Sequence, residues 1–381
     1  MKRKRKKKSS AIRRAVVKVG SNVLTAQAGL NIDAISSISS QISRLLDQGI
    51  QIILVSSGAM ASGMKKMAFP KRPEAIPKRQ AISAIGQAGL IREWEKAFAR
   101  FDRKVAQILL TSDDLVSRKR YLNARNTMNT LLEWQVVPII NENDTIMVEE
   151  IKLGDNDNLA AMISLLLDVD IFINLTDIDG LYDKDPRVCP DARLIPRVAT
   201  YSKSIEKYAG DIPGALGTGG MLSKIKAARK VTASGIPMVI AKGYRPDILI
   251  RLAAGEPHGT FFVPREQKLN RKKCWIGYTV NPQGTLKVDA GAARALMNNG
   301  KSLLPSGIVD VQGQFPVGAA VAVITEERQL IGNGLVNYNA EEIRTIMGLK
   351  TSQIKARLGQ KTYDEVIHRD NLVITGEPEA A

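Results

Sequence analysis

Carboxylate and carboxamide side chains gather in two clusters just after an apolar segment of the chain. Residues 136–140 (Val-Val-Pro-Ile-Ile) are typical of a short buried strand, and Asn-Glu-Asn-Asp follows directly at residues 141–144. A second cluster, Gly-Asp-Asn-Asp-Asn, occupies residues 154–158. Side chains past the carboxyl end of a parallel strand line the ligand crevice of an open sheet, and acids beside amides suit a ligand with an ammonium and a carboxylate group. A solvated turn rich in Asn and Asp is the alternative interpretation.

Glycines precede a helical pattern at residues 214–224 (Gly-Ala-Leu-Gly-Thr-Gly-Gly-Met-Leu-Ser-Lys). Glycine frees the backbone to approach an anion, and a helix start offers unpaired N–H groups to phosphate oxygens. Lys224 adds a positive charge in the first turn. The order of residues differs from the usual phosphate loop, Gly-x-x-x-x-Gly-Lys-Ser/Thr. The segment indicates an anion site of another type, and a flexible surface loop is the alternative.

Polar groups also mark the ends of two earlier strand patterns. Lys18 interrupts the otherwise apolar residues 15–19, and Ser-Ser-Gly-Ala at residues 56–59 follows the apolar residues 51–55. A lone Lys on a strand usually faces solvent, but in an otherwise apolar strand Lys18 is a candidate second cation. The serines offer hydroxyl and backbone N–H groups to a carboxylate. The nucleophile elbow requires Gly-x-Ser-x-Gly, which this segment lacks.

Acidic residues follow a further apolar segment, residues 171–175. The sequence from 176 to 187 is Thr-Asp-Ile-Asp-Gly-Leu-Tyr-Asp-Lys-Asp-Pro-Arg. A calcium loop of the EF-hand type needs Gly at its sixth position, and Gly180 is fourth from Asp177. We therefore exclude calcium and expect a loop that frames a nucleotide base or ribose.

The elements that must position these residues alternate between strands and helices. Strand patterns at 15–19, 51–55, 104–110, 136–140, 171–175 and 237–241 are joined by helical patterns that include 32–46, 118–134 and 159–167. Strands that are apolar on both faces and alternate with helices predict an α/β fold with a three-layer αβα arrangement and a mainly parallel sheet. We place this domain at residues 13–270.

The sequence pattern changes after residue 270 to short strands and turns. Strand patterns at 284–289, 317–324 and 329–338, with one helical pattern at 290–299, predict a small β-rich barrel domain over residues 283–361.

Composition narrows the class of protein. The chain has 381 residues and a formal net charge of +17, and the seven consecutive Lys or Arg residues at positions 2–8 predict a disordered basic tail over residues 1–12. No apolar run suits a bilayer span or a secretory signal, so we expect a cytoplasmic protein without membrane attachment. Two cysteines and two histidines are too few for a disulfide framework or a histidine-rich metal centre.

Several separated motifs, taken in order, resemble the amino-acid kinase family, and within it the kinases that act on glutamate. The C-terminal domain resembles a PUA domain through residues 288–292 and 302–308. Asn22 departs from the pattern, because many relatives have Ser there, and the basic tail is outside it. The motifs that carry the resemblance lie at residues 17–21, 56–59, 141–144, 154–158, 176–187 and 217–224.

The resemblance implies an enzyme that transfers the γ-phosphoryl group of ATP to the side-chain carboxylate of L-glutamate, the first step of proline biosynthesis, with Mg²⁺ bridging phosphate oxygens. Lys18 and Lys224 would hold the phosphates, and Asp157 would orient both ammonium groups. The attacking carboxylate is ionised at neutral pH, so no general base is needed. The implied glutamate ligands are Ser57, Asp144 and Asn156 with Asp155 nearby, and the implied ATP ligands are Lys18, Thr176, Asp177, Thr218, Gly219, Gly220, Met221, Leu222, Ser223 and Lys224.

Alternatives remain at this stage. Another amino-acid kinase, such as one for N-acetylglutamate, would meet no α-ammonium group and should carry fewer acids here. An RNA-binding protein would suit a PUA domain and a basic arm, but it would leave the kinase motifs unexplained, and we do not expect specific nucleic-acid binding. The resemblance further implies a homodimer or homotetramer, inhibition by proline, and contact with the reductase that consumes glutamyl phosphate.

Overall fold

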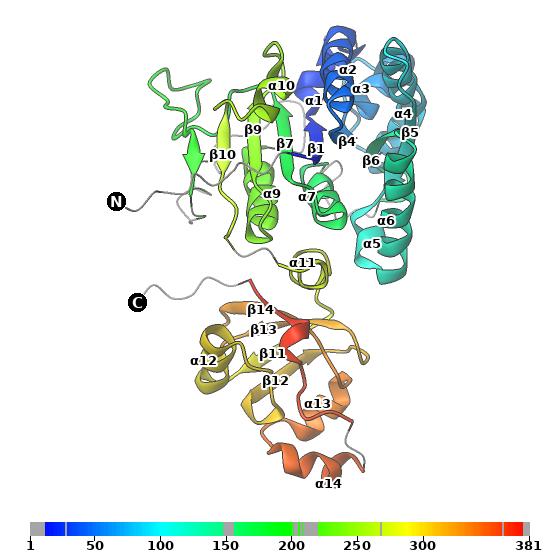
Figure 1. The fold of residues 1–381 in the computed structure, drawn as a ribbon. Coiled ribbons are helices and arrows are strands. Elements are labelled where there is room, and N and C mark those ends of the chain that lie inside the picture. Colours follow the sequence, from blue (N-terminus) through cyan, green and yellow to red (C-terminus); the bar gives the residue numbers. More distant parts are fainter. Residues whose placement is uncertain are drawn as a thin grey trace, which may run out of the picture. The chain divides into compact units, whose positions relative to one another are not determined.

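A computed structural model describes residues 12–26, 29–147, 156–199, 201, 205, 208, 220–266, 269–359 and 362–375. The chain divides into two compact units (Figure 1). The larger comprises Met1–Asp114 and Arg118–Lys268, and the smaller comprises Leu115–Ser117 and Leu269–Ala381. Among the described residues, no helix has the length and apolar character needed to cross a membrane.

An eight-stranded sheet forms the centre of the larger unit, in the order β5-β6-β4-β1-β7-β9-β10-β8. Neighbouring strands from β5 to β9 run parallel, and β10 runs antiparallel to β9. The expected mainly parallel sheet is confirmed. The strands are β1 (Arg14–Val19), β4 (Gln51–Ser56), β5 (Val105–Leu110), β6 (Val137–Glu142), β7 (Ile171–Thr176), β8 (Arg197–Val198), β9 (Met238–Lys242) and β10 (Thr260–Phe262), with a separate hairpin of β2 (Thr25–Ala26) and β3 (Gly29–Leu30).

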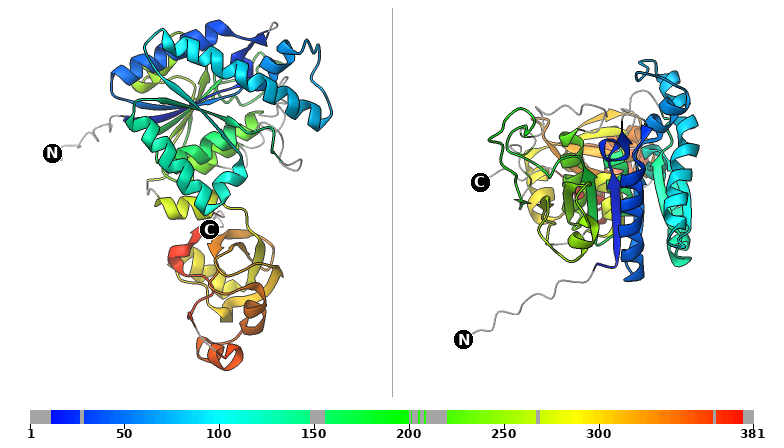
Figure 2. Two further views of the ribbon diagram at one scale, coloured as in Figure 1. Left: turned by 90° about the vertical axis from the view of Figure 1, so that its right-hand side faces the viewer. Right: turned by 90° about the horizontal axis from the view of Figure 1, so that it is seen from above.

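Helices cover both faces of this sheet (Figure 2). Side chains of α2, α4 and α10 share one apolar core with the sheet, and α7 packs against α9 and β1 on the other side. The helices described in this unit are α1 (Ser21–Leu24), α2 (Ile32–Asp47), α3 (Ala59–Lys66), α4 (Ile76–Ala99), α6 (Arg118–Glu133), α7 (Asn156–Leu167), α9 (Met221–Ala233) and α10 (Ile248–Ala253), and α5 (Ser112–Val116) has residues in both units.

Strand alternation decides which face of the sheet receives Lys18. Successive side chains of a strand point to opposite faces, and Val17 and Val19 belong to the core shared with α2 and α4. Lys18 therefore faces the layer that contains α7 and α9. In the register of β1 with β7, Lys18 lies beside Asn174, so two polar side chains meet on one face of a sheet that is otherwise apolar there.

Helix α4 is the longest of the elements that the sequence patterns did not predict. It packs closely on α3, because a Cβ atom on Gly63 would lie 1.9 Å from the Ile82 carbonyl oxygen and one on Gly86 would lie 1.8 Å from the Ala59 carbonyl oxygen. Small and polar residues, including Ser83 and Gln87, are buried along the packed face. These residues interrupt the apolar side chains of the same face, such as Ile82, Leu90 and Trp94, and so weaken the apolar stripe by which an amphipathic helix is recognised.

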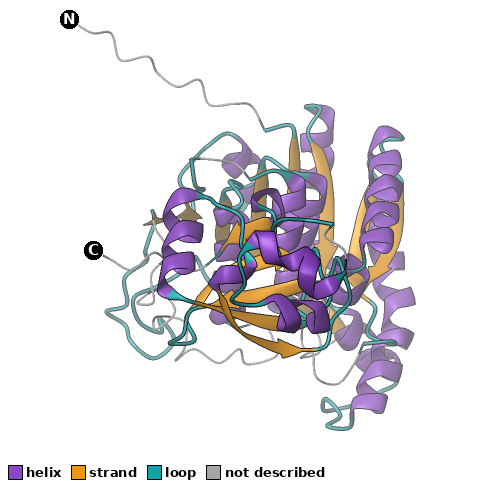
Figure 3. Ribbon diagram, turned by 90° about the horizontal axis from the view of Figure 1, so that it is seen from below, coloured by secondary structure: helices purple, strands orange, loops and turns teal. Residues whose placement is uncertain are grey.

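The smaller unit contains a five-stranded sheet in the order β12-β11-β13-β14-β15, and Figure 3 distinguishes helices from strands by colour. The three predicted strand regions and the helix at 290–299 are present. Strand β12 (Ile308–Gly313) was missed, as was the short strand β15, and α13 was missed although its Asn-x-x-Glu start forms a capping box. The elements are β11 (Gly284–Val288), β12 (Ile308–Gly313), β13 (Ala320–Ile324), β14 (Leu330–Leu335), β15 (Leu372–Ile374), α11 (Arg271–Tyr278), α12 (Ala290–Asn299), α13 (Ala340–Ile346) and α14 (Ile354–Leu358), with short 3₁₀ turns at Pro305–Gly307, Thr351–Gln353 and Arg369–Asn371.

We predict that Gly86→Ala lowers the free energy of unfolding by about 1–3 kcal/mol, the usual cost of overpacking, because the new methyl group meets a backbone oxygen of α3. Gly89→Ala on the same helix is the matched control. Its Cβ would approach only the side-chain hydroxyl of Ser62, which can rotate away. Urea unfolding followed by circular dichroism measures both variants, and equal effects would show that the contact with the backbone of α3 is not the cause.

Candidate active site

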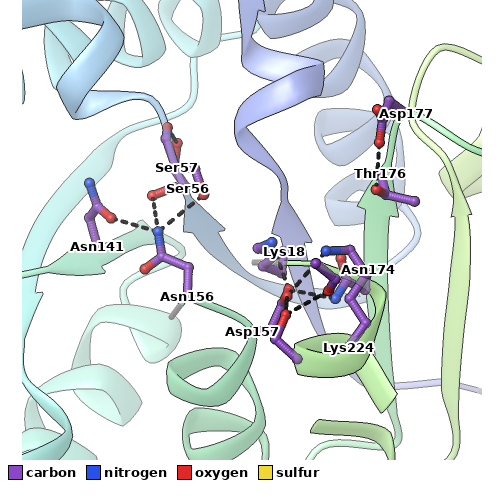
Figure 4. Close-up of polar contacts among 12 residues, drawn as sticks. Lys18, Ser56, Ser57, Asn141, Asn156, Asp157, Asn174, Thr176, Asp177 and Lys224 are labelled. Atoms are coloured by element: carbon purple, nitrogen blue, oxygen red, sulfur yellow. Dashed lines mark hydrogen bonds and ion pairs between the residues drawn. The ribbon is translucent and has the colours of Figure 1, made fainter. Parts of the chain in front are cut away.

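A buried carboxylate joins two buried lysines in the larger unit. Asp157 lies in the first turn of α7, Lys18 on β1 and Lys224 in the first turn of α9. The Lys18 Nζ atom is 2.6 Å from Asp157 Oδ1, and the Lys224 Nζ atom is 3.2 Å from Asp157 Oδ2. All three side chains are at most 6% exposed. Figure 4 shows the two ammonium groups converging on the carboxylate from different elements.

Electrostatics keep Asp157 ionised. Burial alone would raise the pKa of this carboxyl group, but the charges of Lys18 and Lys224, with hydrogen bonds from Lys18 and Ser223, hold the pKa well below its usual range. An ion pair taken out of water is stable only when its geometry is good and its remaining lone pairs are satisfied. Two ammonium groups held beside one carboxylate, as the described residues show, are suited to an anionic ligand.

Two neutral side chains also form hydrogen bonds with the carboxylate of Asp157. The amide of Asn174 donates to Oδ1 at 2.8 Å, and the Ser223 hydroxyl lies 2.6 Å from Oδ2. Ser223 was expected from the sequence as an ATP ligand, without a contact to Asp157. Asn174 was missed, although it is a polar residue in an otherwise apolar strand, the same feature that drew attention to Lys18.

A second network begins at the neighbouring residue of α7. Asn156 Nδ2 donates to Ser57 Oγ at 3.1 Å and to Asn141 Oδ1 at 3.0 Å. Its Oδ1 atom is buried and has no hydrogen-bond partner among the described residues. Figure 4 shows Asn156 turned toward the ends of β4 and β6, while Asp157 turns toward β1. The orphaned oxygen is an acceptor available to a ligand with N–H groups.

Helix α4 supports this second network from the side. Trp94 Nε1 donates to Ser56 Oγ at 2.8 Å, and Asn141 Nδ2 donates to Gln87 Oε1 at 3.2 Å. Gln87 also donates to the carbonyl oxygen of Glu142 at 3.3 Å. The ends of β4 and β6 are thus held in place by a helix that the sequence patterns did not predict.

Asp144 lies on the same side of the site as Asn141. Burial raises the pKa of its carboxyl group, and a hydrogen bond from Ser83 and the charge of Arg72 oppose that shift. Ser83 is a fully buried residue of α4. A partly desolvated carboxylate of this kind is stabilised in its ionised form when a cationic group, such as an ammonium ion, binds beside it.

A third polar group lies at the carboxyl end of β7. Thr176 Oγ1 donates to Asp177 Oδ1 at 3.0 Å, and Asn22 Nδ2 donates to Asp177 Oδ2 at 2.8 Å. Thr176 follows Asn174 by two residues and therefore points to the same face of the sheet. Asn22, the residue that departs from the family pattern, is thus a direct partner of Asp177.

The remaining expected ligands divide between the start of α9 and segments outside the described residues. Gly220 is the N-cap of α9, and Met221, Leu222, Ser223 and Lys224 form its first turn. Thr218, Gly219 and Asp155 lie outside the described residues, as does the predicted tail except for residue 12.

The smaller unit has a cavity of its own, of about 750 Å³. Basic and acidic side chains line it together, among them Lys301, Arg369 and Glu365. It shares no residue with the cluster around Asp157.

Comparison with known proteins decides the family. The amino acid kinase family matches residues 13–242, and the PUA domain matches residues 284–358. The chain belongs to the amino acid kinase family. The expected fold, with a PUA domain after the kinase domain, is confirmed.

Close relatives extend the similarity over nearly the whole chain. A protein of Meiothermus ruber named glutamate 5-kinase is 49% identical over 367 residues, covering 96% of this chain and 97% of the relative. Glutamate 5-kinases of Caldanaerobacter subterraneus subsp. tengcongensis and Syntrophus aciditrophicus are 49% and 47% identical and cover 95% of this chain, with 97% and 94% of their own lengths matched.

We predict that Asp157→Asn lowers the free energy of unfolding at neutral pH by about 3–5 kcal/mol, because it removes the negative charge that both buried ammonium groups contact. The pKa of Asp157 is lowered by folding, so its contribution is present above about pH 4, the ordinary aspartate range, and is lost as the pH falls toward the lowered value. Denaturant unfolding across a pH series measures this difference.

Asp191→Asn is the matched control, since it removes one partner of the exposed Lys184–Asp191 pair. We expect no measurable change in that variant. Equal stability of the two variants at neutral pH would contradict the assigned role of Asp157.

Proposed function

We propose that this chain transfers the γ-phosphoryl group of ATP to the side-chain carboxylate of L-glutamate and forms L-glutamyl 5-phosphate. The observation that carries the proposal is the buried Lys18–Asp157–Lys224 cluster beside a second polar network at Asn156. Membership of the amino acid kinase family and 47–49% identity to proteins named glutamate 5-kinase support this substrate. The alternatives, a kinase for N-acetylglutamate and an RNA-binding protein, have no comparable support.

The chemistry asks the protein mainly for positioning and charge. Phosphoryl transfer spreads negative charge over three equatorial oxygens, and fixed cations in a site with little water stabilise that charge strongly. Lys18 and Lys224 supply two cations from different elements. Asp157 fixes the distance between them, and the acceptor carboxylate attacks in its ionised form without a base.

Magnesium belongs to this proposal as the partner of the ATP phosphates. It prefers oxygen ligands and commonly binds one or two carboxylates together with phosphates. Both oxygens of Asp157 already accept hydrogen bonds from lysine, asparagine or serine side chains. We therefore assign the ion chiefly to phosphate oxygens, where it would neutralise their charge.

Glutamate fits the second network. Asn156 is adjacent in sequence to Asp157, so an acceptor held by Asn156 and Ser57 lies next to the two lysines. The orphaned Oδ1 atom of Asn156 and the carboxylate of Asp144 would accept hydrogen bonds from the α-ammonium group. N-acetylglutamate has no ammonium group and would bring no cation to Asp144.

The family resemblance also supports finer expectations, which stay predictions. These are the roles of the individual site residues, the domain boundaries 13–270 and 283–361, inhibition by proline, a homo-oligomer, transfer of the product to a reductase, and a cytoplasmic location.

We predict that Lys224→Met lowers kcat by about 10²-fold or more, because it removes one of the cations that stabilise the transition state. Trapping of the acyl phosphate with hydroxylamine, together with ADP release, measures the reaction. Lys226→Met, at an exposed position of the same helix, is the control and should retain activity. Unchanged kcat in Lys224→Met would remove this lysine from the mechanism. Absence of glutamate-dependent acyl phosphate with the wild-type enzyme would overturn the proposed function itself.

We predict that Asp144→Asn lowers kcat/KM for glutamate by about 10- to 100-fold, since a charged hydrogen bond is lost, and leaves the KM for ATP unchanged. Glutarate, which lacks the ammonium group, should lose nothing. Burial raises the pKa of Asp144, and the protonated carboxyl group carries no charge for the ammonium group. The KM for glutamate in the wild-type enzyme should therefore rise as the pH falls through the pKa of Asp144. An equal loss for glutamate and glutarate would show that Asp144 does not bind the ammonium group.

A further inference from the structure

Three residues of α4 form a row that runs beside the segment from Asn141 to Met147. Gln87 contacts Asn141, Ser83 contacts Asp144, and Gln80 donates to the carbonyl oxygen of Met147 at 3.0 Å. The residues face one strand end because helical positions three or four apart share a face. The row leads from the buried Gln87 toward the N-terminus of α4.

Arg79 continues the row one helical turn beyond Ser83. Positions i and i+4 are neighbours on a helix surface, and each turn advances about 5.4 Å. The Nε atom of Arg79 is buried and has no hydrogen-bond partner among the described residues. An unpaired buried donor costs free energy, and a carboxylate bound by the fork of an arginine would satisfy it.

The charges around Arg79 also favour an anion. Arg72 feels the charges of both Arg79 and Asp144, and burial together with Arg79 lowers the pKa of Arg72. Within the described residues, this cluster has two guanidinium groups and one carboxylate. An ammonium group bound at Asp144 neutralises the carboxylate that balances the two arginines. A carboxylate on the same ligand would supply a new negative charge beside them.

We infer that Arg79 binds the α-carboxylate of glutamate, with Arg72 supporting it, and thereby selects α-amino acids over simple ω-carboxylates. This inference rests on the proposed function. The order along α4 matches the order of groups in the substrate. The reacting carboxylate lies beside the lysines, the α-ammonium group at Asn156 Oδ1 and Asp144, and the α-carboxylate at Arg79.

A comparison of two substrates with two residues tests this assignment. 4-Aminobutyrate has the reacting carboxylate and the ammonium group of glutamate and lacks the α-carboxylate. We expect Arg79→Met to raise the KM for glutamate about 10- to 100-fold, as removal of a charge-assisted hydrogen bond implies. The inhibition constant of 4-aminobutyrate against glutamate should stay within about twofold, since that ligand never uses Arg79. Arg79→Lys should restore part of the lost affinity.

The matched control is Arg92→Met, which removes an exposed arginine from the same helix. It should change neither constant. An unchanged KM for ATP shows that Arg79→Met folds. Equal weakening of glutamate and 4-aminobutyrate, or no change in either, would overturn the inference. A wild-type enzyme without activity on glutamate would instead overturn the proposed function, so the two failures are distinguishable.

Discussion

The ion pairs of Asp157 are the interaction on which the rest of the site depends. A carboxylate buried in the first turn of α7 accepts contacts from Lys18 on β1 and Lys224 on α9, so one side chain connects a central strand with two helices of the covering layer. This carboxylate offsets part of the cost of burying the two ammonium groups. The same arrangement keeps two cations ready at a fixed separation, and binding of phosphate groups then requires little rearrangement.

Adjacency in α7 couples the two halves of the site. Asn156 faces the ends of β4 and β6, and Asp157 faces β1. The polar network that binds the acceptor and the charged cluster that binds the phosphoryl group are therefore built on adjacent residues of one helix. Helix α4 stabilises the acceptor side through Trp94 and Gln87. Its close packing on α3, which requires Gly63 and Gly86, therefore bears on substrate binding as well as on stability.

Much of this arrangement could be predicted from the sequence where the pattern is local. Apolar strands that end in polar residues predicted the parallel sheet and the positions of Lys18, Ser57 and Asn156. The contact of Ser223 with Asp157 depends on how α9 packs against α7, which no local pattern contains. Asn174 acts through its register with Lys18, on two strands that are far apart in the sequence. Helix α4 escaped prediction because Ser83, Gly86 and Gln87 interrupt the apolar residues of its packed face. A role for Arg79 could be inferred only from its position on that helix.

The most direct test of the account is the structure of the enzyme with ADP, magnesium, glutamate and an aluminium fluoride mimic of the transferring phosphoryl group. We predict that the Nζ atoms of Lys18 and Lys224 both lie within hydrogen-bond distance, about 3 Å, of fluoride or phosphate oxygen atoms while each keeps its contact with Asp157. A complex in which either lysine turns away from the phosphoryl mimic, or in which Asp157 releases both, would contradict the central claim.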